Sequence, residues 1–71
     1  MEAMTLQEIF RAKFRARVLA DPRSVRTLAD VSGYSESYIS RVINGSKPNP
    51  TLAFVETMAV TLNVPLADLL Q

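Results

Sequence analysis

A glycine between two short helical segments constrains the fold of this chain more than any other feature. The segment from Val25 to Asn44 reads VRTLADVSGYSESYISRVIN, and Gly33 lies near its middle. Glycine lacks a Cβ atom, so it suits the left-handed backbone that ends one helix and turns the chain sharply into the next. Ala29 is small enough to let two helices cross closely. The segment therefore predicts two short helices joined by a tight turn.

The second of these helices is expected to have one apolar and one polar face. Ser35 can cap its start, and Glu36 follows in the first turn, where the helix dipole favours negative charge. On a helical wheel, Ile39, Val42 and Ile43 point inward. The opposite face carries the polar residues Glu36, Ser37, Ser40, Arg41 and Asn44.

This polar face has two interpretations. It can enter the major groove of DNA, where side chains such as Arg, Asn, Glu and Ser hydrogen-bond to base edges. It can also be the ordinary solvated face of a helical bundle. The helical wheel alone leaves both interpretations open.

Capping residues and helical periodicity predict a first helix before this segment. Thr5 and Glu8 fit the capping-box pattern, and Asp21-Pro22 should end the helix at about Ala20. Ser24 can then cap the next helix, from Val25 to about Ser32. The positions expected to bury the first helix in the core are Leu6, Ile9, Phe10, Phe14, Val18 and Leu19.

Two more helices are expected after the central segment. Residues 44–50 form a turn rich in Asn, Gly and Pro, and Thr51 can cap a helix that ends near Asn63. Pro65 suits the first position of a short last helix. The apolar positions of these two helices are Leu52, Val55, Met58, Ala59 and Leu62, followed by Leu66, Leu69 and Leu70. The chain is thus predicted to be all-α, a compact five-helix single domain over residues 1–71.

Composition argues against several classes of function. The 71 residues include no cysteine and no histidine, which removes disulfides and the usual zinc ligands. The only adjacent Ser and Lys, Ser46 and Lys47, lie in the proline-rich turn without an evident base alignment. We therefore expect no enzyme, no metal and no cofactor. No signal-peptide pattern is visible and no apolar run approaches the roughly 20 residues of a membrane helix, so a cytoplasmic protein without a membrane partner is expected.

The charge distribution is more informative than the net charge of +1. Between Arg11 and Arg26 the basic residues face one acid, Asp21, whereas residues 51–71 carry only Glu56 and Asp68. One end of the domain is therefore basic. This asymmetry favours contact with phosphates, although a solvated helix surface is the simpler alternative.

The stretch from about Ser24 to Leu70 resembles the helix-turn-helix of the phage repressor and Cro family, also called the XRE-like family, with a lambda repressor-like fold. The resemblance rests on Leu28-Ala29, Gly33, Ile39-Ser40, Val42, Asn44-Gly45, Pro50-Thr51-Leu52 and Leu62-Asn63-Val64. It implies a sequence-specific transcriptional regulator of a bacterial or phage-infected cell, a repressor that binds double-stranded DNA at a palindromic operator as a homodimer.

Candidate DNA-contacting residues follow from side-chain chemistry and from the resemblance together. The expected base contacts are Ser35, Glu36, Ser37, Ser40 and Arg41, and the expected phosphate contacts are Arg26, Tyr38, Asn44, Lys47 and Asn49. Glu36 can instead serve only the helix dipole, and Tyr38 can simply cover the core. Arg23 and one or more of the first helix's arginines can add charge, and which of them faces DNA is left open.

The last helix is the expected dimer surface, as it is in relatives. Its candidate residues are Leu66, Leu69 and Leu70. The alternative is that these leucines only cap the monomer core. A different class of function also stays open, because an antitoxin or another protein-binding helical module can use the same scaffold.

Overall fold

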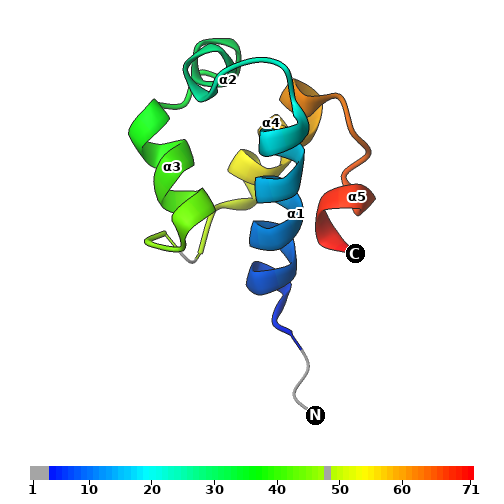
Figure 1. Cartoon of the computed structure of the whole chain (residues 1–71). Helices are drawn as coiled ribbons and strands as arrows, with labels where there is room; N and C mark the ends of the chain where they lie inside the picture. The colour runs from blue at the N-terminus through cyan, green and yellow to red at the C-terminus, as the bar shows by residue number, and fades with distance from the viewer. Residues whose placement is uncertain (1–3, 48) are drawn as a thin grey trace.

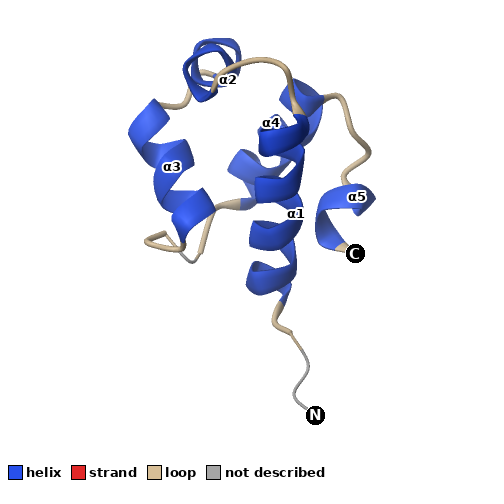
Figure 2. Ribbon diagram, viewed as in Figure 1, coloured by secondary structure: helices blue, strands red, loops and turns tan. Residues whose placement is uncertain are grey.

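The computed structural model describes residues 4–47 and 49–71, and this part of the chain contains five helices and no strand (Figures 1 and 2). The helices are α1 (Leu6–Ala20), α2 (Val25–Ser32), α3 (Glu36–Asn44), α4 (Leu52–Leu62) and α5 (Ala67–Leu70). In Figure 1, α2 and α3 lie to one side of α1, and α5 lies on its other side. The predicted all-α fold of five helices is confirmed.

Side-chain caps begin four of these helices at the predicted residues. At α1, the Thr5 hydroxyl accepts from the Glu8 N–H at 3.2 Å, and Glu8 Oε1 accepts from the Thr5 N–H at 3.0 Å. Ser24, Ser35 and Thr51 each accept a bond from the N–H three residues later, at 3.0 to 3.1 Å. These bonds satisfy backbone donors that have no partner within the helix.

Residues in the left-handed conformation end three of the helices. Gly33 ends α2 with φ 83°, Gly45 ends α3 with φ 88°, and Asn63 ends α4 with φ 56°. The start of α5 differs from the prediction, because the helix begins at Ala67 and Pro65 lies in the turn before it. The Pro65 carbonyl still accepts from the Asp68 N–H at 3.0 Å, so the proline leads into the helix without being part of it.

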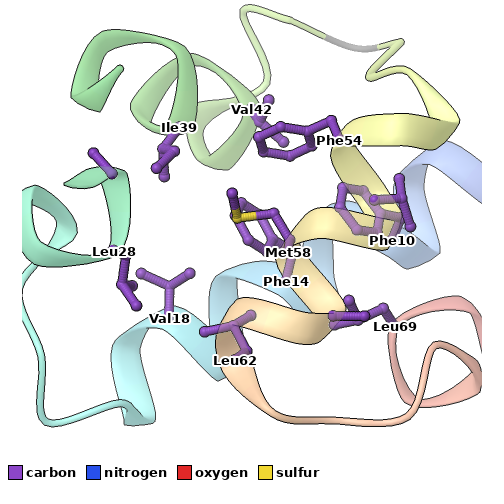
Figure 3. Packing of buried hydrophobic residues seen from close by; sticks show 13 residues of the cluster. Phe10, Phe14, Val18, Leu28, Ile39, Val42, Phe54, Met58, Leu62 and Leu69 are labelled. Atoms are coloured by element: carbon purple, nitrogen blue, oxygen red, sulfur yellow. The ribbon is translucent and has the colours of Figure 1, made fainter. Parts of the chain in front are cut away.

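Aromatic rings from α1 and α4 form the centre of the core (Figure 3). Phe10 stacks on Phe14 with ring centroids 5.3 Å apart, and Phe54 meets Phe14 edge-on at 5.6 Å. Around these rings lie Val18, Leu28, Ala29, Ile39, Val42, Val55, Met58, Ala59, Leu62 and Leu69. All five helices therefore contribute to one core.

Three leucines that periodicity assigned to the apolar faces of α1 and α4 lie at the surface. Leu6 is 57%, Leu19 is 70% and Leu52 is 78% exposed. Leu6 lies in the first turn of α1, which projects beyond the neighbouring helices in Figure 1. Leu19 is one residue past the buried Val18, and Leu52 is about 200° around α4 from the buried Phe54. The inward face of α4 thus includes Phe54, which the predicted apolar positions omitted.

Candidate nucleic-acid interface

The turn between α2 and α3 is built around Gly33. Its N–H donates to the Ala29 carbonyl at 2.9 Å, and its φ of 83° directs the chain into α3. A Cβ atom added at Gly33 would have no atom within 4 Å, so backbone conformation, rather than space, requires glycine here. The next residue, Tyr34, packs its ring edge-on against Phe54 at 4.8 Å. The turn is therefore anchored to α4.

Helix α3 is fixed to the core by one face. Ile39 is 0% and Val42 is 1% exposed, whereas Ile43 is only half-buried. The opposite face is exposed along its whole length, as the helical wheel predicted. Its residues are Glu36, Ser37, Ser40, Arg41 and Asn44.

Four of the candidate base-contacting residues have free side chains on this face. Within residues 4–47 and 49–71, the side chains of Glu36, Ser37, Ser40 and Arg41 make no hydrogen bond or ion pair with the protein. Ser35 differs, because its oxygen accepts from the Tyr38 N–H at 3.0 Å as the helix cap. The hydroxyl proton of Ser35 remains available to a ligand.

The candidate phosphate contacts cluster at the C-terminal end of α3 and in the following loop. Asn44 Oδ1 accepts from the Ser46 N–H at 3.0 Å, and Asn49 Oδ1 accepts from Gln7 Nε2 at 3.1 Å. These bonds use the amide oxygens and leave the NH₂ groups of Asn44 and Asn49 to donate. Lys47 Nζ lies 5.4 Å from the centroid of the Tyr38 ring.

The two remaining candidate phosphate contacts, Tyr38 and Arg26, differ in how far they are buried. Tyr38 is half-buried, with its ring centroid 4.9 Å from that of Phe54. Its ring therefore covers the core, which was one of the two roles considered for it. Arg26 lies exposed in the first turn of α2. The structure thus leaves Arg26 exposed and Tyr38 only partly exposed to solvent.

The other basic residues have different surroundings. Arg17 forms an ion pair with Asp68 at 3.1 Å, which ties α1 to the start of α5. Arg23 forms an ion pair with Asp21 at 2.9 Å, and hydrogen bonds from Arg23 lower the pKa of the Asp21 carboxyl to about 2. The guanidinium of Arg23, which was expected to add charge to a binding surface, is therefore neutralised by a carboxylate of the same chain, while 36% of the Arg23 side chain is exposed.

The proposed dimer residues divide by exposure. Leu69 is 0% exposed and packs in the core, as Figure 3 shows, so it is removed from the candidate surface. Leu70 is half-buried and Leu66 is 41% exposed. Leu66 also lines an open hollow of about 580 Å³ together with Val60, which is 81% exposed.

In the described ranges, no helix has the length and apolar character needed to cross a membrane. The same residues contain no group of three or more acidic side chains that could hold a metal ion.

Comparison with known proteins places this geometry in a family. A family model described as helix-turn-helix matches residues 23–69, from just before α2 into α5. The HTH-type transcriptional regulator SlrR of Bacillus subtilis (strain 168) is 39% identical over 46 residues, which cover 65% of this chain and 30% of SlrR. No solved structure matches the chain. Since the family match includes α2, the Gly33 turn and α3 in full, the chain belongs to the XRE-type helix-turn-helix family.

Proposed function

We propose that this protein is a sequence-specific DNA-binding regulator of transcription that reads bases with α3 in the major groove. The observation that carries the proposal is the exposed face of α3, on which Glu36, Ser37, Ser40 and Arg41 have no partner among the described residues. The opposite face is locked into the core through Ile39. A rigid helix with unpaired polar side chains suits recognition of base edges.

Each side chain has a distinct role in this proposal. Arg41 pairs with guanine through two hydrogen bonds to O6 and N7, and Glu36 accepts from cytosine N4. Ser37 and Ser40 donate to or accept from either kind of base edge. Ser35 donates only its hydroxyl proton, because its oxygen already caps α3.

Contacts to phosphates position α3 without reading sequence. Lys47 and Arg26 supply positive charge, while Asn44 and Asn49 donate from their NH₂ groups. The Tyr38 hydroxyl is the fifth donor, held in place by the packing of its ring on Phe54. These residues lie in α2, α3 and the loop before α4, so they flank the base-reading face.

Repression through a palindromic operator requires two copies of the domain on one stretch of DNA. Two-fold dimers read half-sites about 34 Å apart, which is one helical turn. We assign the contact between copies to Leu66 and Leu70, joined by Val60 from the neighbouring hollow. Such a dimer acts where bacterial or phage DNA lies, in the cytoplasm.

The decisive experiment is selection of bound duplexes from a randomised DNA pool with purified protein near physiological salt. Enrichment of an inverted repeat with half-sites one turn apart is the expected result. The control is Arg41→Ala in the same selection, which should relax the preference at one base position. Absence of enrichment with the unaltered protein would overturn the proposal and favour a protein-binding role for the scaffold.

A further inference from the structure

Arg11 reaches from α1 to the C-terminal end of α3. Its Nε–H donates to the Ile43 carbonyl at 3.1 Å, across 32 residues of sequence. The last carbonyls of a helix lack partners within the helix and carry the negative end of its dipole. Arg11 therefore supplies both a hydrogen bond and a positive charge to the end of the helix that carries the candidate base contacts.

Gly45 lies close to the same guanidinium. A Cβ atom added at Gly45 would lie 3.1 Å from Arg11 Cζ and 3.3 Å from both Nε and Nη1. The φ of 88° favours glycine here, and a Cβ atom would in addition push the Arg11 side chain aside by a few tenths of an ångström. The Arg11 guanidinium thus contacts the Ile43 carbonyl and lies close to the backbone of Gly45, although the side chain is exposed to solvent.

Arg11 and Lys47 share a small hollow at this place. The hollow, of about 100 Å³, lies where the first turns of α1 meet the end of α3 and the loop that follows it. Its one acid, Glu8, accepts from the Thr5 N–H at the start of α1, and that hydrogen bond lowers the pKa of Glu8. With Glu8 ionised, the two cations still leave the hollow with net positive charge.

Two other arginines, Arg17 in α1 and Arg23 in the following connection, are already paired with carboxylates of the protein. Arg17 pairs with Asp68 on the α5 side of the molecule, and Arg23 pairs with Asp21. Arg11 has no carboxylate within ion-pair distance in the portion of the chain that the structure describes. Its two terminal nitrogens likewise have no hydrogen-bond partner there, so the guanidinium is fixed in position but retains free donors.

We propose that Arg11 binds a backbone phosphate of DNA beside Lys47, with its terminal N–H groups, while its Nε–H stays on the Ile43 carbonyl. The inference rests on the proposed function, which it deepens by assigning one arginine of α1 to the DNA backbone. Since the same guanidinium holds the end of α3, phosphate binding and placement of α3 in the groove are coupled. Arg11 then fixes where α3 lies relative to the DNA backbone.

The test is the salt dependence of affinity for a mixed-sequence DNA duplex, measured between about 50 and 200 mM salt. Arg11→Ala should lower the slope of log affinity against log salt by about one unit, because one phosphate contact is lost. The affinity ratio between unaltered protein and variant should accordingly shrink about 3.5-fold across this range. Arg17→Ala, the matched control on the same helix, should leave the slope unchanged.

A second variant separates phosphate binding from a merely structural role. Arg11→Lys keeps the charge but loses the planar donor to Ile43, so it should restore the slope found with the unaltered protein. Unfolding in urea shows whether each variant is folded under the binding conditions. An unchanged slope for Arg11→Ala, with weaker binding only in step with stability, would overturn the inference and leave the proposed function standing. Absence of duplex binding by the unaltered protein at low salt would overturn both.

Discussion

Arg23 donates from Nε and Nη2 to the two carboxylate oxygens of Asp21, at 3.0 and 2.9 Å, and from Nη2 also to the Thr61 carbonyl at 2.8 Å. The Asp21 side chain is only 11% exposed. These bonds fasten the connection between α1 and α2 to the last turn of α4. A basic residue in a cationic stretch of sequence is therefore used to hold the domain together.

The ion pair between Asp21 and Arg23 should make the stability of the protein sensitive to acid. The pKa of Asp21 is about 2 in the folded protein against an ordinary 3.8, so its stabilising effect is complete above pH 3.8 and is lost as the pH falls toward 2. Asp21→Asn should lower the unfolding temperature at neutral pH and flatten its decline between pH 4 and 2. Thermal unfolding followed by circular dichroism at several pH values measures both effects. Parallel curves for the two proteins would contradict the assignment.

Substitution of Arg41 and of Lys47 should separate base reading from phosphate binding. Arg41→Ala should weaken binding to a selected site by about 1–3 kcal/mol and relax selectivity at one base position. Lys47→Ala should weaken binding to all duplexes similarly. Affinities for the selected site and for a mixed-sequence duplex provide the comparison. Equal losses on both duplexes for Arg41→Ala would remove its base-reading role.

The two glycines provide a matched pair of backbone substitutions. Gly33→Ala and Gly45→Ala should each lower stability by roughly 1–2 kcal/mol, because both positions are left-handed. Gly45→Ala should lower it further, since the new Cβ atom displaces the Arg11 guanidinium. This extra loss should disappear in an Arg11→Ala background, as urea unfolding of the double-mutant cycle will measure. An extra loss that persists without Arg11 would show that Gly45 meets a different constraint.

Leu69 and Leu66 should differ in what their removal affects. Leu69→Ala should lower the free energy of unfolding by about 2–5 kcal/mol, because it opens a cavity in the core. Leu66→Ala should change stability by less than about 0.5 kcal/mol but weaken cooperative binding of two copies to one operator. Urea unfolding at low temperature and gel-shift titration measure the two properties. Undiminished cooperativity in Leu66→Ala would remove this residue from the dimer surface.

Local signals were sufficient to predict the helices and the outward face of α3. Thr5, Ser24, Ser35 and Thr51 are capping residues whose effect is confined to the next three positions, so their role is visible in sequence. The helical wheel predicted the exposed face of α3 correctly, because helical periodicity is also a local property of the sequence. The role of these outward residues on DNA remains a prediction.

The features that sequence reasoning missed depend on contacts between distant residues. Phe54 meets rings from α1 and from the α2 to α3 turn, and no local spacing shows which side of an apolar helix such neighbours will cover. The Arg11 bond to Ile43 likewise requires knowledge of how α1 crosses α3. The close approach of Gly45 to the Arg11 side chain likewise can be found only in the three-dimensional structure.

The packing of Tyr34 and Tyr38 on Phe54 gives the protein an intrinsic fluorescence probe. These are its two tyrosines, and it has no tryptophan. Their ring centroids lie 5.3 Å apart and within 4.9 Å of the Phe54 ring, at the junction of the turn, α3 and α4. Intrinsic tyrosine emission therefore originates wholly from the base of the helix-turn-helix. Any ligand that shifts α3 against α4 will alter that emission in the native, unlabelled protein.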